Sequence, residues 1–498
     1  MGPQHQPIAA VFLAVSVLAL SGCSIGPKYK IPTAPTPPAY KEMGNWKIAQ
    51  PNDQNLGGNW WEMFRDSNLN TLEQQVEVSN QNLKAAFAQY QEARALVRYY
   101  RADYYPTLTA NPSASREKYS ENRPPAASSF NGKTFNEFVV PLDLSYQTNA
   151  FGRVSRNVEY YREQAQASAA DLAVVNLSVH ATLALDYFAA RTLDAEEKLL
   201  QDTVTQYQMA LQLNVDRYEG GAGSEVEVEQ ARTILETTRA QAVDVGVARA
   251  QYEHAVAVLL GKPPADFSLA HLPLTTPPPP IPVGVPSELL ERRPDIAAAE
   301  RQVASAKAQV GLAKLAYYPV INLIASGGFE SGAITTLFQG PSAIWALGGS
   351  AAETIFDVGR RRALSDQAKM AYDSTAANYR ETALTAFQQV EDNLAALRIL
   401  ETEAATQADA ISAAQRSVQL SNNRYKGGVA SYLEVTTTQS AALADERVGV
   451  DILRRRMAAT VQLIKALGGG WNVANLPSAS VPGHSSGNGG GEGQVAAR

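Results

Sequence analysis

The chain has 498 residues, 45% of them hydrophobic, and a formal net charge of -6 at pH 7. A net negative chain is unfavourable for binding nucleic acid, so we expect no nucleic-acid partner. Cys23 is the only cysteine, which excludes an internal disulfide. The whole chain contains only six methionines, so the composition gives no support to a methionine-based copper or silver relay.

The first 22 residues contain no Asp, Glu, Lys or Arg and are largely apolar from Ile8 to Leu20. They end in Leu20-Ser21-Gly22-Cys23, a pattern typical of an export signal with a lipobox. This segment resembles the signals of bacterial lipoproteins. The resemblance implies that Cys23 is lipidated and becomes the mature N-terminus, and that Ser24 is compatible with outer-membrane delivery. We expect no cofactor besides this covalent lipid.

Residues 23–60 are rich in Pro and Asn, which predicts an extended, lipid-anchored segment. A first structural unit follows over 61–262. It opens on Trp60-Trp61, interpreted as packing residues, and continues through a helix from Leu72 to Asp103 that lacks Gly and Pro. Alternating apolar side chains from Phe138 to Tyr146 then predict a strand, in a β-hairpin over about 106–148.

The first unit ends in a predicted helical hairpin over 153–260. Arg153 to Glu219 contains neither Gly nor Pro, and at 1.5 Å per residue such a helix is about 100 Å long. The returning segment has apolar or small residues at heptad spacing, with Arg249 interrupting the pattern. These residues are Val228, Ala231, Leu235, Thr238, Ala242, Val245, Tyr252, Val256 and Leu259.

A Pro-rich linker over 263–286 separates this unit from a second one over 287–471. The second unit repeats the plan, with a helix, a β-hairpin over about 319–356 and a helical hairpin over 360–467. Gly152-Arg153 returns as Gly359-Arg360, and Leu260-Gly261 as Leu467-Gly468, both 207 positions later. The chain is therefore an internal duplication. Residues 472–498, Gly- and Ser-rich from Gly483, predict a disordered tail.

No run of about 18 apolar residues follows Cys23, so no transmembrane helix is expected. The predicted strands are about ten residues long, which suits a tilted membrane strand. Four strands are too few to close a barrel, and open edges in lipid leave backbone groups unpaired. We therefore expect a mainly α fold with a small β part. Three chains would form a 12-stranded outer-membrane β-barrel, four strands per chain, continuous with a long periplasmic α-helical barrel.

Several motifs resemble the TolC-like outer-membrane efflux proteins, in the lipoprotein branch that serves resistance-nodulation-division pumps. They are Trp60-Trp61 with Phe64 and Asp66, the run Leu289-Leu290-Glu291-Arg292-Arg293-Pro294-Asp295-Ile296 ending at Glu300, Tyr-Tyr-Pro at 104–106 and 317–319, and Arg-Tyr-x-Gly-Gly at 217–221 and 424–428. The resemblance implies a homotrimeric exit duct in the outer-membrane lipid, with a periplasmic adaptor and an inner-membrane pump as partners. It implies export of small molecules such as drugs or toxic organic compounds, and no enzyme chemistry.

The two Arg-Tyr-x-Gly-Gly motifs mark the far ends of the helical hairpins. Glycines there allow the chain to reverse, and a serine shortly after each motif can cap the returning helix. By resemblance, these turns form the tip that docks the adaptor; the alternative is that they only make turns. The candidate docking residues are Arg217, Tyr218, Gly221, Ser224, Arg424, Tyr425, Gly428 and Ser431.

One turn before each tip lie Leu213 with Asp216 and, 207 positions later, Leu420 with Asn423. In a threefold assembly, any residue that faces the axis becomes a ring, and such a ring can constrict a pore and select on charge. We interpret these four residues as a candidate periplasmic gate. The alternative is that both leucines belong to the seam between helices.

Three other functions remain to be weighed. The five histidines are scattered, and no nucleophile elbow, phosphate loop or metal spacing occurs, which disfavours an enzyme. A lipid-anchored structural coiled coil would use the long helices but not the two hairpins of membrane length. An outer-membrane channel for type I protein secretion stays within the same family, although the lipobox and the Arg-Arg-Pro-Asp run favour small-molecule efflux.

Overall fold

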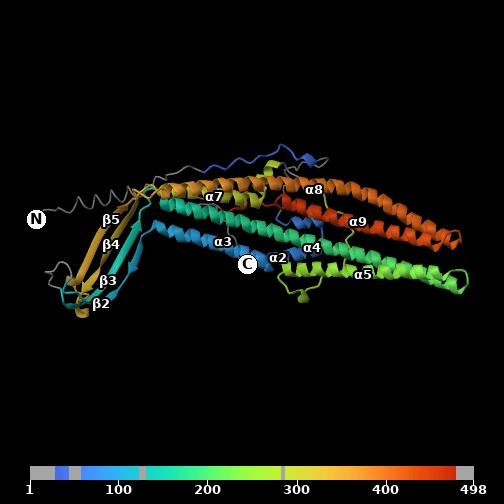
Figure 1. Ribbon diagram of the computed structural model, residues 1–498, viewed down its shortest axis with the longest axis horizontal. Helices are drawn as coiled ribbons and strands as arrows, with labels where there is room; N and C mark the ends of the chain where they lie inside the picture. Colours follow the sequence, from blue (N-terminus) through green and yellow to red (C-terminus); the bar gives the residue numbers. More distant parts are fainter. Residues whose placement is uncertain (1–28, 44–57, 123–130, 282–285, 478–498) are drawn as a thin grey trace, which may run out of the picture.

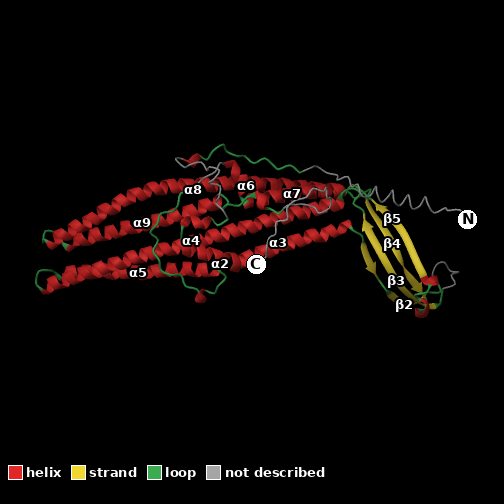
Figure 2. Cartoon of the chain, turned by 180° about the vertical axis from the view of Figure 1, so that it is seen from behind, coloured by secondary structure: helices red, strands yellow, loops and turns green. Residues whose placement is uncertain are grey.

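The computed structural model describes residues 29–43, 58–122, 131–281 and 286–477 (Figure 1). The molecule is elongated, with a β-sheet at one end and two helical hairpins that reach the other end. Figure 2 shows the same arrangement from behind, with all strands gathered beyond the helices. The predicted signal peptide, Cys23 and the Gly- and Ser-rich part of the tail lie outside the described residues.

The predicted helix from Leu72 to Asp103 is two helices, α2 (Ser67–Ser79) and α3 (Gln81–Arg101). Asn80 lies between them in an extended conformation. Its side-chain oxygen accepts a hydrogen bond from the Leu83 amide at 3.0 Å, and its amide donates to the Leu259 carbonyl at 2.7 Å. A continuous helix was therefore the wrong prediction, because the local cap at Asn80 also makes a tertiary contact.

The second repeat has the same break, between α6 (Leu289–Arg292) and α7 (Pro294–Leu315). Here Arg293 takes the place of Asn80, and its guanidinium donates to the Ala466 carbonyl at 3.1 Å. Arg293 also forms an ion pair with Asp295. The conspicuous Arg-Arg-Pro-Asp run therefore joins the start of α7 to the far helix of its repeat, and Pro294 occupies the first helical position as expected.

The two helical hairpins have equal dimensions. The first consists of α4 (Arg153–Glu219) and α5 (Glu225–Leu259), and the second of α8 (Arg360–Lys426) and α9 (Tyr432–Ala466). The long helices have 67 residues each and the returning helices 35. This match confirms the duplication.

The heptad pattern correctly marks buried positions of α5, including Val228, Ala231 and Leu235, and Ala231 packs against Leu211 of α4 as well as against the second hairpin. The sequence predicted that Arg249 would interrupt this pattern, but Arg249 is buried within the helical interface. It is 5% exposed, its Nε lies 3.1 Å from the Asp194 carboxylate, and it also pairs with Glu253. A buried cation is tolerated in a helical interface when paired carboxylates satisfy it.

One 18-residue stretch of α4 is long and apolar enough in composition to cross a membrane. Within the chain, 44% of that stretch is buried. The stretch is part of a continuous 67-residue helix that packs on α3, α5 and α7. Burial against these helices accounts for part of its apolar character.

The sheet contains β1 (Thr107–Ala110), β2 (Ser113–Lys118), β3 (Thr134–Gln147), β4 (Val320–Ser331) and β5 (Ala343–Ala352). Both β1 and β2 pair with β3 in one antiparallel register, so they form a single strand interrupted at Pro112. The interruption follows because proline cannot donate to the ladder. β4 joins β3 to β5, which brings the two predicted hairpins into one sheet.

Paired residues in a ladder lie on the same face of a sheet, so the register sorts the side chains. One face, here called the apolar face, carries Leu108, Phe138, Val140, Leu142, Leu144, Tyr146, Phe329, Trp345 and Leu347. The opposite face, here called the polar face, includes Thr109, Ser115, Glu137, Asp143, Ser145, Asn322, Ser326 and Glu330. The sheet is therefore amphipathic from its helix-proximal end as far as the Ala114–Phe138 pair.

The main hydrophobic core lies midway along the helices, where both repeats meet. The short helix Trp60–Phe64 places Trp60 and Trp61 in this core at 2% and 4% exposure, which confirms that these residues pack.

Two short helices, Pro264–Asp266 and Pro286–Glu288, lie at the ends of the linker.

Both terminal segments contact the body. Residues 29–43 lie along α7 and α8 (Figure 1), where the Lys41 amide donates to Glu391 at 2.7 Å. At the other end, the tail is ordered further than predicted. Trp471 and Leu476 pack against small residues of α4 and α7, and a short helix spans Val473–Asn475. Residues 472–477 therefore belong to the folded part.

Candidate functional site at the helical tips

Both hairpins reverse through the same glycine turn. Gly221 has φ +71° and Gly428 has φ +68°, in the left-handed region that glycine adopts without strain. The Ala222 amide donates to the Arg217 carbonyl at 2.7 Å, and the Val429 amide to the Arg424 carbonyl at 2.9 Å. These bonds satisfy carbonyls left free at the ends of α4 and α8.

The two serines that follow the turns differ. The Ser224 hydroxyl accepts a hydrogen bond from the Glu227 amide, and the Glu227 carboxylate accepts one from the Ser224 amide, which makes a complete capping box. Ser431 occupies the equivalent N-cap position, but its side chain makes no cap hydrogen bond. The expected cap is therefore present in the first repeat and missing in the second.

Tyr425 joins the two hairpins. It is 3% exposed, and its hydroxyl donates to the Asn214 side-chain oxygen at 2.5 Å. The same hydroxyl lies 3.4 Å from the Glu227 carboxylate. Burial, with the negative charge of Glu227 next in importance, raises the pKa of Tyr425. Its ring packs on Tyr432 within a small apolar cluster, so this side chain is not on the free surface.

The remaining candidate docking residues make different contacts in the two repeats. The Arg217 guanidinium lies 4.7 Å from the centre of the Tyr425 ring, which adds a cation–π contact between the hairpins. Arg424, its counterpart, instead pairs with Glu434 in its own hairpin at 3.1 Å. Tyr218, the counterpart of Tyr425, is 47% exposed. The first repeat therefore presents an exposed tyrosine, and the second an exposed arginine that is paired with Glu434.

The four candidate gate residues lie just above these turns. Leu213 and Leu420 are 37% and 53% exposed in the single chain, so neither is buried in the seam of its own hairpin. Asp216 and Asn423 are also exposed, and the Asp216 carboxylate accepts a hydrogen bond from Gln212 at 2.8 Å. All four side chains are therefore available to a pore or to a neighbouring chain.

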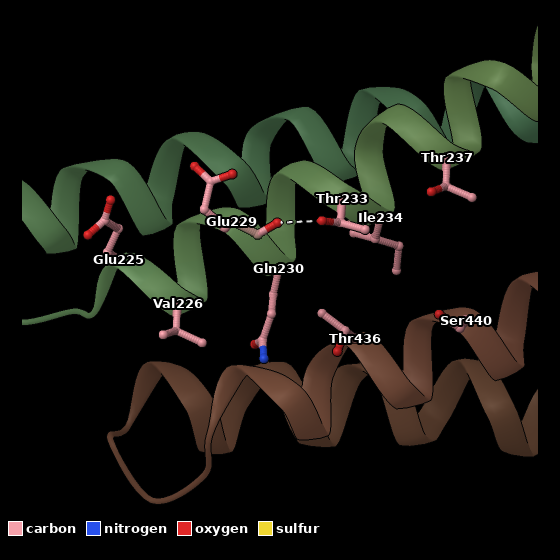
Figure 3. Close-up of a pocket in the computed structure, with 9 residues that line it drawn as sticks. All are labelled: Glu225, Val226, Glu229, Gln230, Thr233, Ile234, Thr237, Thr436 and Ser440. Carbon is pink, nitrogen blue, oxygen red and sulfur yellow. Dashed lines mark hydrogen bonds between the residues drawn. The ribbon is translucent and has the colours of Figure 1, made fainter.

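A groove of about 750 Å³ opens beside the tips, between α5 and α9 (Figure 3). Val226, Gln230 and Ile234 point from α5 toward α9, where Thr436 and Ser440 form the opposite wall. Glu225 and Glu229 lie on its rim. The α9 wall of the groove is therefore made of short polar side chains, and the α5 wall is partly apolar.

Sequence reasoning missed Asn214, Glu227 and Tyr432, which complete the contact between hairpins. The Ser-x-x-Glu pattern at 224–227 was a readable signal for the capping box. Asn214 had no such signal, because its partner is 211 residues away.

Long helical hairpins fused to an amphipathic sheet of membrane length define a class, the outer-membrane channel proteins that extend into the periplasm. The sequence pattern described as "Outer membrane efflux protein" matches residues 72–262 and 285–469. The chain therefore belongs to the outer membrane efflux protein family, whose members are transport channels, and it is an outer-membrane efflux channel.

Relatives and solved structures agree with this assignment. The chain is 32% identical over 476 residues to the toluene efflux pump outer membrane protein TtgF of Pseudomonas putida, covering 93% of this chain and 98% of that protein. It is 30% identical to the cation efflux system protein CusC of Escherichia coli, over 91% and 97% of the two chains. The CmeC outer membrane channel of Campylobacter jejuni matches with a TM-score of 0.84 and 26% identity, over 91% and 96%.

Proposed function

We propose that this protein is the exit duct of a tripartite efflux pump and exports small organic molecules such as solvents or antibiotics. A trimer of chains would span the outer membrane, and a periplasmic adaptor would connect it to an inner-membrane resistance-nodulation-division pump. The relatives named for toluene and antibiotic efflux support the substrate class.

The observation that carries this proposal is the amphipathic sheet with two unpaired edges. The edge formed by β1 and β2 and the edge formed by β5 have no partner strand among the described residues. Unpaired edges are costly in lipid, and three sheets joined edge to edge remove all of them. The same threefold arrangement would place twelve long helices around one axis.

The tips would receive the adaptor. Tyr218 and Arg424 are exposed there, and the groove between α5 and α9 opens beside them. Gly221, Gly428, Ser224 and Ser431 would set the shape of this surface, while Arg217 and Tyr425 would hold the two hairpins together beneath it.

Lipid on Cys23 would anchor the chain from the periplasmic side of the outer membrane. The described N-terminal segment supports this role, because it runs along α7 and α8 toward the sheet (Figure 1). Replacement of Cys23 with Ala should abolish incorporation of labelled palmitate.

The function is tested by expression in a strain that lacks its own exit duct but keeps adaptor and pump. Restored efflux, together with a heat-resistant trimer that conducts ions in planar bilayers, is the expected result. A monomer that forms no channel would contradict the proposal. Secretion of a protein substrate without small-molecule efflux would favour the type I secretion channel instead.

A further inference from the structure

The apolar face of the sheet ends in two cations. Along the β2–β3 ladder, Ala114 pairs with Phe138, and the next residues on the same face are Arg116 opposite Asn136 and Lys118 opposite Thr134. Because side chains alternate, Arg116 and Lys118 project from one side of the strand, about 7 Å apart. Both are exposed, and neither has an ion-pair partner among the described residues.

Acidic side chains of the same ladder are sorted onto the other face. Glu117 pairs with Phe135, and Glu137 pairs with Ser115, so both carboxylates lie on the polar face. The sequence Arg116-Glu117-Lys118 therefore divides its charges by sign, with cations on the side that would meet lipid and anions on the side that would meet the lumen.

The position of these cations identifies their surroundings, if the chain is the membrane duct proposed above. They lie at the end of the sheet farthest from the helices (Figure 2), and the helices extend into the periplasm. The two cations thus follow the last apolar residue on the outward side, at the level of the outer-leaflet headgroups. Unpaired cations at this level attract anionic headgroups, and arginine matches phosphate with a two-pronged hydrogen-bonding geometry.

We propose that Arg116 and Lys118 form a binding patch for the phosphorylated sugar headgroup of an outer-leaflet glycolipid. Apolar residues from Phe138 to Tyr146 would lie against the acyl chains of the same lipid. Each trimer would carry three such patches. The proposal rests on the proposed function, because it requires the sheet to span the outer membrane.

Native mass spectrometry of the full-length trimer in detergent tests the patch, with diphosphoryl lipid A as the probe. The variant R116Q/K118Q should bind it about 30-fold more weakly than the parent, because each cation near a lipid surface contributes about fivefold. Glu117→Gln, on the same strand but the polar face, should bind like the parent. Exchange of the two cations, R116K/K118R, should restore binding in the case where the glutamine variant folds poorly.

Two further measurements separate the outcomes. Inorganic phosphate and phosphatidylcholine should not displace lipid A, and displacement by phosphate alone would overturn a lipid patch in favour of a free-anion site. All variants are also measured for conductance in planar bilayers. Conducting channels with equal lipid A affinity in parent and R116Q/K118Q overturn the patch alone, whereas a parent that forms no channel overturns the duct and the patch together.

Discussion

At the scale of single residues, the core contains one ionisable pair that is uncharged at neutral pH. His180 Nδ1 lies 2.6 Å from Glu73 Oε2, both residues are buried, and the Trp61 ring stacks on His180 at 4.6 Å. Burial raises the pKa of Glu73 to about 9 and lowers the pKa of His180 to about 4. The Glu73 carboxyl therefore keeps its proton and donates it to the imidazole.

This pair makes stability depend on pH with a definite sign. Between the ordinary glutamate pKa of 4.5 and about 9, the folded state holds one proton that the unfolded state has lost, so stability falls as pH rises. His180 acts in the opposite sense only below its ordinary pKa of 6.5. From pH 6.5 to 9, the protonation of Glu73 should lower the free energy of unfolding by up to about 1.4 kcal/mol for each unit that the pH rises.

Glu73→Gln should remove most of this slope, because an amide donates the same hydrogen bond without titrating. Thermal unfolding of the purified protein across pH 6.5 to 9 measures this slope, with Glu77→Gln at an exposed neighbour as the control. Parallel profiles for parent and Glu73→Gln would contradict a protonated Glu73.

A second residue-scale prediction concerns the contact between hairpins. Tyr425→Phe removes the hydroxyl that donates to the buried Asn214 side-chain oxygen, and an unsatisfied buried acceptor costs about 1–3 kcal/mol. The tips should then separate more readily, with faster amide hydrogen exchange over 211–232 and 421–438. Tyr218→Phe, the exposed counterpart, should leave exchange unchanged. Equal exchange in both variants would show that Tyr425 does not hold the hairpins together.

At the scale of elements, the turns at the tips can be tested through their glycines. A β-carbon at Gly221 or Gly428 would meet no atom within 4 Å, so a leucine there adds bulk and backbone strain of about 1–2 kcal/mol without a clash. The double leucine variant should reach the outer membrane as a trimer but export poorly. Gly359→Leu, at φ +86° with equally open space but at the other end of α8, should retain export. Normal efflux in the tip variant would argue against docking at these turns.

The same elements show why the sequence predicted some features and not others. Absence of Gly and Pro delimited α4 and α8 to the residue, and period-two alternation located β3, because both signals are local. The break at Asn80 and the seam position of Arg249 were missed, because a distant carbonyl and a distant carboxylate stabilise them. The unequal roles of Tyr218 and Tyr425 were equally invisible, since identical motifs meet different neighbours.

At the scale of the whole molecule, the proposed threefold assembly would turn each exposed residue near the tips into three. Leu213 and Leu420 would contribute six apolar side chains, and Asp216 three carboxylates where Asn423 contributes three amides. If these side chains face the axis, the apolar ones narrow the pore and the carboxylates favour cations. Narrowing and charge selection are separable in one experiment, because each depends on different side chains.

Single-channel recording measures both effects. Alanine at Leu213 and Leu420 should raise conductance, because smaller side chains widen the constriction, whereas Asp216→Asn should lower the preference for cations at nearly constant conductance. Val243→Ala, at a still more exposed apolar residue on α5, is the control for a general effect of removing apolar surface from the hairpins. Unchanged conductance in the double alanine variant would place these leucines away from the axis.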